Sequence, residues 1–182
     1  MHMHRMTGES ALSVVSALDS HGVRFCIDGG WAVDALLGKQ TREHSDLDIW
    51  LPAADLDPLI VAFSGVGIDR VLPWGGDRPW NFVLHDGGCL RVDLHLYEEL
   101  SDGLIHYGSV LTGGRFMSAD LGGVGHILGT VVRCETPQWA LQCHTGYAPR
   151  EVDFHDVAQL CTEFGLPLPE TYRTSITGDD AG

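Results

Sequence analysis

Apolar residues recur along the chain at two spacings, one typical of helices and one typical of strands. Residues 10–21 place apolar side chains at helical spacing behind Ser10, a suitable N-cap, and predict an opening helix. A short strand over 24–27 and a helix over 31–37 that ends at Gly38 follow. Residues 46–51 alternate polar and apolar positions and therefore predict a strand with one polar face.

The rest of the chain continues with a helix, several strands and two closing helices. Residues 56–63 suit a helix, and residues 68–72, 81–97 and 125–134 suit strands, with a hairpin turn at 86–88. Residues 137–147 and 152–165 read as helices bounded by Pro137 and Gly165. This order predicts an α+β fold, with a mixed, mainly antiparallel sheet flanked by helices. We expect a main domain over 1–135, a short helical element over 136–172 and a flexible tail over 173–182.

Composition narrows the class of protein. A chain of 182 residues with 44% hydrophobic content can bury the core of one domain. Its formal net charge of −14 opposes binding to nucleic acid and favours cationic or neutral partners. No apolar run approaches the roughly 18 residues of a membrane span, so we expect a soluble, cytoplasmic protein without a membrane partner. Its five cysteines show neither disulfide nor zinc spacing.

Three aspartates stand at positions suited to a metal site. Asp46 and Asp48 lie two apart on a predicted strand, so their carboxylates share one face. Asp93 lies on the polar face of another predicted strand, in the alternating segment 91–97. If the two strands are neighbours, three like charges meet on one surface and require a cation, and carboxylate oxygens suit Mg²⁺. A solvated strand face is the alternative for the Asp46 and Asp48 pair alone.

A glycine pair supplies a partner for phosphate. Gly29 and Gly30 stand directly before the predicted helix over 31–37. Glycines allow a phosphate to approach the backbone closely, and the free N–H groups at a helix start attract anions. The pair becomes informative because the aspartate pair follows on the next predicted strand.

This combination carries a family resemblance. Residues 29–50, GGWAVDALLGKQTREHSDLDIW, resemble the signature of the polymerase-β-like nucleotidyltransferases, in which GG or GS opens a helix and DxD follows on a strand. The wording is similar to the antibiotic-modifying branch, which contains the lincosamide nucleotidyltransferases and the aminoglycoside adenylyltransferases. Residues 143–160, CHTGYAPREVDFHDVAQL, also resemble a segment near the end of the small lincosamide enzymes. The resemblance implies a nucleotidyltransferase fold, with the catalytic domain in residues 1–135.

The resemblance also implies roles for single residues. It makes Asp46, Asp48 and Asp93 catalytic metal ligands, with Asp93 completing the metal site or serving as the base. The positions that it assigns to nucleotide binding are Gly29, Gly30, Trp31, Thr41, Arg42 and His44. Arg42 could contact a phosphate through its planar fork of donors. Trp31 replaces a phosphate-binding serine of many superfamily members, so backbone N–H groups would have to make that contact.

The implied reaction is attack of a substrate hydroxyl on the α-phosphate of a nucleoside triphosphate, ATP in the first instance, with release of pyrophosphate. Two Mg²⁺ ions about 3.5–4 Å apart would assist it. Asp93 is the expected base and His95 the alternative. The acceptor would be a small antibiotic, and its predicted contacts are His95, Tyr97, His144 and Tyr147. Asp153, His155 and Asp156 stay open between lining the acceptor or nucleotide side and plain helix-surface polarity.

Two rival functions remain at this point. One is nucleotidyl transfer to a protein or to tRNA, as in toxin–antitoxin systems of the same fold, and the acidic charge speaks against tRNA. The other is a homologue without activity that only binds a nucleotide, which the presence of all three acids disfavours. A symmetric homodimer is the commonest assembly for such a chain and is left open.

Overall fold

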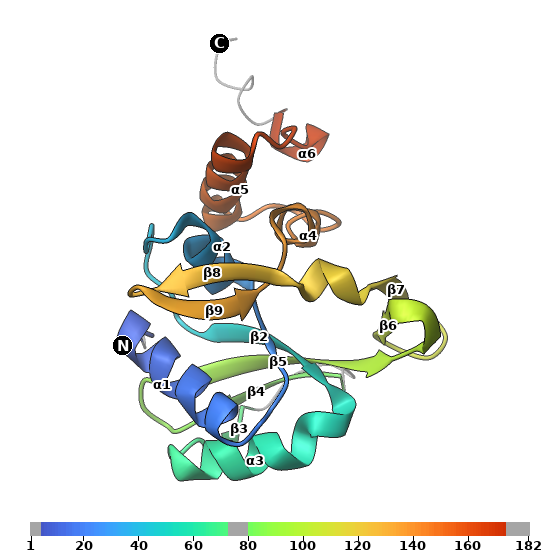
Figure 1. Cartoon of the computed structure of the whole chain (residues 1–182). Coiled ribbons are helices and arrows are strands. Elements are labelled where there is room, and N and C mark those ends of the chain that lie inside the picture. Colours follow the sequence, from blue (N-terminus) through green and yellow to red (C-terminus); the bar gives the residue numbers. More distant parts are fainter. Residues whose placement is uncertain (1–4, 73–79, 174–182) are drawn as a thin grey trace.

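The structure, a computed structural model, describes residues 5–72 and 80–173. Within these residues one mixed sheet crosses the middle of the molecule, with helices above and below it (Figure 1). The helices are α1 (Gly8–Ser20), α2 (Gly29–Leu37), α3 (Leu56–Gly65), α4 (Pro137–Cys143), α5 (Glu151–Phe164) and α6 (Glu170–Arg173). The strands are β1 (Cys26–Asp28), β2 (Leu47–Pro52), β3 (Arg70–Val71), β4 (Asn81–His85), β5 (Arg91–Glu99), β6 (Leu104–Tyr107), β7 (Gly114–Met117), β8 (Gly123–Ile127) and β9 (Thr130–Cys134).

The strand order is β3-β4-β5-β2-β1-β9-β8, and β6 pairs with β5 and β7. The β2/β5 and β1/β9 pairs are parallel, and the remaining pairs are antiparallel. This confirms the predicted α+β fold with a mixed, mainly antiparallel sheet flanked by helices. The sequence did not predict β6 and β7, because each has only four residues and shows no clear alternation.

The opening helix starts earlier than its periodicity predicted. Thr7, rather than Ser10, is the N-cap of α1, and its hydroxyl accepts a hydrogen bond from the backbone N–H of Ser10 at 3.2 Å. The end of α2 is as predicted, since Gly38 adopts the left-handed conformation with φ of 69°. Gly165 closes α5 in the same way.

The core lies between the sheet and the helices on each side. One face of the sheet, with Leu47 and Ile49 of β2 and Leu94 of β5, packs with α1 and α3. The short helix α2 is buried on both sides, because Trp31, Ala32 and Ala35 join that core while Val33 joins a second one. The start of α2 is therefore held rigidly against the sheet.

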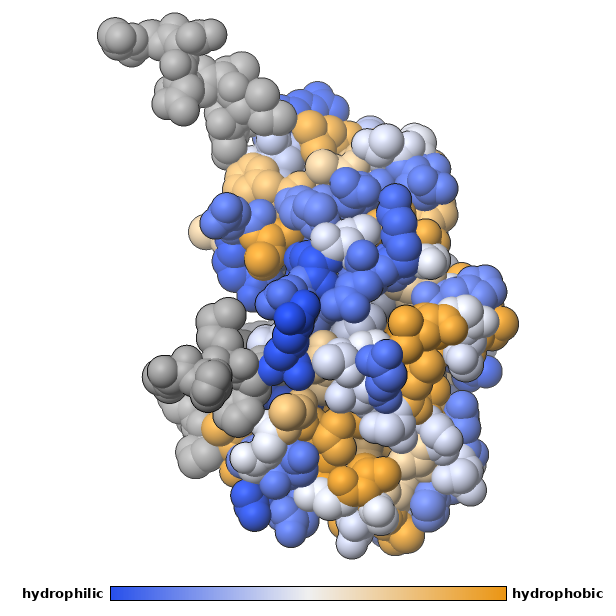
Figure 2. Space-filling view, turned by 90° about the vertical axis from the view of Figure 1, so that its left-hand side faces the viewer, coloured by the Kyte–Doolittle hydropathy of each residue, from blue (hydrophilic) through white to orange (hydrophobic). Residues whose placement is uncertain are grey.

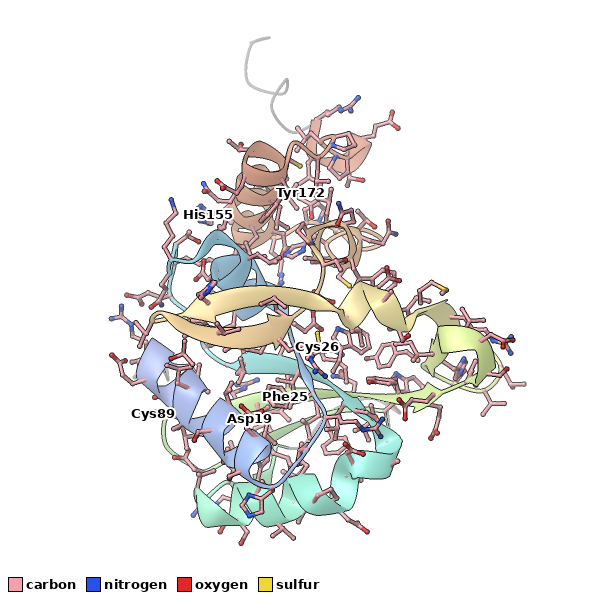
Figure 3. All side chains as sticks on the ribbon, viewed as in Figure 1. Asp19, Phe25, Cys26, Cys89, His155 and Tyr172 are labelled. Atoms are coloured by element: carbon pink, nitrogen blue, oxygen red, sulfur yellow. The ribbon has the colours of Figure 1, made fainter. Side chains whose placement is uncertain are left out.

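The C-terminal helices stack above α2. Ala140 of α4, Val157 and Leu160 of α5 and Tyr172 of α6 form the second core together with Val33. Tyr172, labelled in Figure 3, is buried and donates a hydrogen bond from its hydroxyl to the backbone oxygen of His144 at 2.5 Å. The expected boundary at residues 135 and 136 falls between β9 and α4, and the tail after Arg173 lies outside the described residues.

The surface is mixed in character. On the face in Figure 2, hydrophilic side chains gather across the middle, and hydrophobic ones gather mainly in its lower part. Among the helices of residues 5–72 and 80–173, none has both the length and the apolar character needed to cross a membrane.

Candidate functional site

Three neighbouring strands place aspartates in one row across the sheet. Asp28 of β1 is in register with Asp48 of β2, and Asp48 is in register with Asp93 of β5. Partners in register on adjacent strands point to the same face, with Cβ atoms about 5 Å apart. The three side chains thus emerge on the face opposite the α1/α3 core, as the alternation in β2 and β5 predicted for Asp48 and Asp93.

Asp46 stands at the margin of this row. Strand β2 begins at Leu47, so Asp46 immediately precedes it, and its carboxylate lies 3.6 Å from Arg91 Nε and accepts a hydrogen bond from Ser45 at 3.0 Å. Burial and the nearby Asp48 carboxylate raise the pKa of Asp46. Asp46 therefore contributes negative charge to the site, while its carboxylate also has a cationic neighbour in Arg91.

Asp48, Asp93 and His95 form a group that could hold a metal ion. Their candidate ligand atoms all lie within 4.8 Å of one another. Asn81 donates a hydrogen bond to Asp93 Oδ1 at 2.7 Å and so fixes that carboxylate. Burial, reinforced by the charge of Asp48, raises the pKa of Asp93 to about 6. Asp48 and Asp93 repel each other when both are ionised. A hard divalent cation between such carboxylates offsets this repulsion and therefore binds favourably.

His95 occupies the next row of the sheet and bridges two parts of the site. Its Nδ1 lies 2.8 Å from the hydroxyl of Tyr107, and its Nε2 lies 3.6 Å from Asp28 and 3.9 Å from Asp48. Burial lowers the pKa of His95, but the carboxylates of Asp48, Asp28 and Asp93 outweigh it and raise the pKa to about 9. The imidazolium thus partly neutralises the row of acids.

A second acidic group adjoins the first and was not predicted. Glu135 follows β9 and is buried, with Trp50 Nε1 donating to its carboxyl at 2.9 Å and Cys143 Sγ donating at 3.4 Å. Asp28, Glu135 and Cys143 also place possible ligand atoms within 4.8 Å of one another. Burial and the Asp28 charge raise the pKa of Glu135 well above its usual range. Asp28 could have been found from its place before the glycine pair, whereas the lone Glu135 carries no spacing signal.

The two glycines are required by side chains that pack on them. Gly29 has φ of 61°, and a Cβ there would lie 2.6 Å from Asp48 Oδ2. A Cβ at Gly30 would lie 2.1 Å from Arg42 Nη2 and 2.8 Å from His44 Cε1. Because the first N–H groups of a helix have no partner within it, the start of α2 presents donors beside Asp48. Asp28 caps this start by accepting from Gly29 N at 2.5 Å.

The segment before β2 forms a buried polar network. Asp34 of α2 accepts hydrogen bonds from the Thr41 hydroxyl at 2.6 Å and from His44 Nε2 at 2.6 Å. Arg42 Nη1 lies 3.1 Å from His44 Nδ1, and because a guanidinium only donates, Nδ1 accepts and Nε2 carries the proton. Trp31 is buried against His44, with ring centroids 4.4 Å apart.

The open space of the site is a cavity of about 510 Å³ that is lined by Asp28 and Asp48 of the row, whereas Asp93 and Asp46 do not line it. Of the predicted nucleotide contacts, Gly29, Gly30 and Arg42 line this cavity. Trp31, Thr41 and His44 do not line it, because their side chains are used in the core and in the network around Asp34. His95, His144 and Tyr147, predicted acceptor contacts, line the cavity, whereas Tyr97 packs beside Trp50 and Ile105 instead.

One wall of the cavity is aromatic. Trp50 meets Tyr107 edge to face at a centroid distance of 4.7 Å, and Phe116 stacks on Trp139 at 4.3 Å. These side chains come from β2, β6, β7 and α4, which the sequence separates widely. The cavity therefore combines acids on its floor with an apolar wall, an arrangement suited to a small organic ligand.

Asp156 of α5 also lines the cavity and is expected to make stability depend on pH. Burial alone would raise the pKa of Asp156, but the hydrogen bonds from Arg42 and the nearby His144 ring, whose Nε2 lies 3.7 Å away, outweigh it and lower the pKa to about 2. The ionised carboxylate then stabilises the fold above pH ~4, the range of an unfolded Asp, and this contribution disappears as the pH falls towards 2. We expect Asp156→Asn to lower the free energy of unfolding by about 2 kcal/mol at pH 7.

Urea unfolding of wild type and Asp156→Asn, measured from pH 7 to pH 2, checks the predicted loss of stability. The difference between wild type and Asp156→Asn should shrink steadily below pH ~4. A difference that stays the same at every pH would contradict the ionic origin of the effect.

Comparison with known proteins gives a consistent family. The profile of the aminoglycoside-2''-adenylyltransferase family matches residues 10–160. The chain is 26% identical over 160 residues to a lincosamide resistance protein of Staphylococcus haemolyticus. This alignment covers 88% of the chain and 98% of that protein. It is 34% identical over 55 residues to a 2''-aminoglycoside nucleotidyltransferase of Escherichia coli, covering 29% of this chain and 31% of that protein.

Solved structures share the fold. The lincomycin-bound lincosamide adenylyltransferase LnuA superimposes with a TM-score of 0.73 at 25% identity, covering 86% of this chain and 97% of that chain. ANT(2'')-Ia in complex with adenylyl-2''-tobramycin has a TM-score of 0.68 at 21% identity, covering 92% and 95%. The family match spans the site as well as the fold, and the chain therefore belongs to the aminoglycoside-2''-adenylyltransferase family and is a nucleotidyltransferase.

Proposed function

We propose that the chain uses Mg²⁺ to transfer a nucleotidyl group from a nucleoside triphosphate to a hydroxyl of a small antibiotic, with release of pyrophosphate. The observation that carries this proposal is the register of Asp48 with Asp93 on parallel strands, beside the glycine start of α2 and at a cavity. The arrangement brings a cation site, an anion site and room for an acceptor together.

The acids fit a magnesium site. Asp48 and Asp93 would hold the cation, and Asp46 would complete its surroundings. When bound, Mg²⁺ neutralises charge on the phosphates and activates the attacking oxygen. The raised pKa values of Asp46 and Asp93 support this, because burial and the neighbouring Asp48 carboxylate make both groups costly to ionise, and a bound cation would offset that cost.

The chain's own groups have separate tasks in this proposal. The N–H groups at the start of α2 orient the triphosphate. Asp93, held by Asn81, accepts the proton of the attacking hydroxyl. His95 is the alternative base, but its Nε2 faces Asp28 and Asp48, and these carboxylates favour the protonated ring, which donates.

The cavity supports an acceptor with an apolar body and little positive charge. Its lining contains three carboxylates, Asp28, Asp48 and Asp156, and one of them is already paired with Arg42. The aromatic wall of Trp50, Phe116 and Trp139 suits apolar or sugar surfaces better than a polycation. A lincosamide fits this lining better than an aminoglycoside, in line with the nearly full-length similarity to a lincosamide resistance protein.

We further propose that residues 1–135 form the catalytic domain and that the helical element of 136–172 closes the cavity. Trp139, His144 and Tyr147 from this element line the cavity opposite Asp48, which supports the division of labour. In a cell, the activity would make its host resistant to the modified antibiotic.

Pyrophosphate release tests the proposal. The purified protein is incubated with Mg²⁺, each nucleoside triphosphate in turn, and lincosamides, aminoglycosides, tRNA or no acceptor. Release that requires a lincosamide, with a mass increase of that molecule by one nucleotidyl group, is the expected result. Release only with an aminoglycoside or only with tRNA would replace the acceptor class, and silence under all conditions would leave a nucleotide-binding protein without this activity.

A further inference from the structure

Asp156 is a buried acid whose place in the site the proposed reaction leaves unexplained. It lies on α5, far along the chain from the other acids, and its side chain is 2% exposed. Arg42 binds it with two nitrogens, Nε at 2.9 Å from Oδ1 and Nη2 at 2.7 Å from Oδ2. A bidentate pair of this kind fixes the plane of the guanidinium as well as its position.

Nearly all donors of Arg42 are used within the protein. Nη1 donates to the backbone oxygen of Glu43 and to His44 Nδ1, both at 3.1 Å. A guanidinium has five N–H bonds, so one N–H of Nη2 remains, and it has no acceptor among the residues that the structure describes. Arg42 therefore cannot offer a phosphate the two-pronged contact that its residue type suggested, and a single donor is left.

That remaining donor lies beside the glycine start of α2. Nη2 is the Arg42 atom that a Cβ at Gly30 would meet, at 2.1 Å, and both residues line the cavity. The first N–H groups of α2 lie at the same place, so the helix start and the guanidinium are arranged to meet the same anion. Lys39, the only lysine of the chain, does not line the cavity, whereas Arg42, Arg115 and Arg150 do, so arginines are the side-chain cations available to a triphosphate there.

We propose that Asp156 is a positioning residue for the nucleotide: its carboxylate holds the Arg42 guanidinium against Gly30, with one N–H of Nη2 directed at a phosphate oxygen. The inference rests on the proposed function for the identity of the anion. It gives the C-terminal helix α5 a direct part in binding the donor, because the carboxylate that orients Arg42 comes from that helix.

Nucleotide affinity measured by calorimetry, without an acceptor, tests this. We use MgATP and the other nucleoside triphosphates with wild type, Asp156→Asn, Arg42→Ala and the double variant. Either single change should raise the dissociation constant of the nucleotide about tenfold, since one charged hydrogen bond is lost. The double variant should be no weaker than Arg42→Ala, because Asp156 acts through Arg42. Once the acceptor is known, its KM should change less than about twofold.

A matched control separates positioning from stability. Asp55 binds Arg24 in the same bidentate way, with distances of 2.9 and 3.1 Å, and neither residue lines the cavity. Asp55→Asn should lower the melting temperature and leave nucleotide affinity unchanged. If Asp156→Asn does not fold, Arg42→Lys, which keeps the charge and loses the fork, replaces it and should also weaken binding.

The outcomes distinguish this inference from the proposed function. The positioning role would be overturned if folded Asp156→Asn bound the nucleotide as tightly as wild type. It would also be overturned if the losses of nucleotide affinity from the two single changes multiplied in the double variant. Nucleotide binding that depends on Asp156, without turnover of any acceptor, would refute the proposed reaction and keep the inference. A wild-type protein that binds none of the nucleotides would overturn both.

Discussion

Asp48→Asn should abolish nucleotidyl transfer, with kcat at least about a thousandfold below wild type. Asp48 is the central member of the row formed with Asp28 and Asp93, and its ligand atom belongs to the group that could hold a metal. Metal assistance contributes several kcal/mol to such a reaction, and each 1.4 kcal/mol is about a factor of ten in rate. The substitution also removes one of several like charges, so the melting temperature should stay the same or rise.

Pyrophosphate release and thermal unfolding, measured on the same samples, check this pair of effects. Asp69→Asn is the matched control, because Asp69 is exposed and its ion pair with Arg70 lies on the surface. It should leave both quantities unchanged. An Asp48→Asn protein that keeps more than a tenth of the activity would refute the metal site, and one that unfolds would show that Asp48 has a structural task.

Gly30→Ala should reduce activity about a hundredfold and destabilise the protein by about 1–3 kcal/mol. The new methyl group would overlap Arg42 Nη2 and His44 Cε1, at distances of 2.1 and 2.8 Å from its ideal position. Neither side chain can move freely, because Arg42 is bound to Asp156 and His44 to Asp34. The clash therefore displaces either Arg42 or the start of α2, and both line the cavity.

Gly65→Ala provides the comparison. Gly65 is the last residue of α3, has no positive φ and would place its Cβ in open space. This change should preserve activity and stability, whereas Gly30→Ala should raise the KM for the nucleotide and lower the melting temperature. Equal behaviour of the two variants would contradict the close packing of Arg42 on Gly30.

The three acids and the glycine pair could be predicted because each belongs to a local pattern. Alternation in β2 and β5 placed Asp48 and Asp93 on the polar faces of two strands, and their register on neighbouring strands agrees with that prediction. Gly29 and Gly30 stood before a helix whose end Gly38 also marked. The roles of these residues in metal and nucleotide binding remain predictions until the variants above are measured.

The sequence was less informative about residues whose contacts are with partners far away along the chain. Trp31 and His44 belong to the segment 29–50 that carries the family resemblance, yet both are buried and their rings pack against each other. Asp156 could not be separated from ordinary helix-surface polarity, since its partner Arg42 is 114 residues away. Glu135 stands alone after a strand, and only the fold brings it to Trp50 and Asp28.

The sequence by itself determined the helices other than α6, most strands, the polar faces of β2 and β5, and the positions of Asp48, Asp93 and the glycine pair. These follow from side-chain periodicity and from backbone preferences, which act between near neighbours. Only the tertiary structure decided that β1 adds Asp28 to the row, that four distant elements supply the aromatic wall, and that α5 reaches Arg42. Such contacts depend on how the sheet and helices pack, and no local pattern in the chain records that packing.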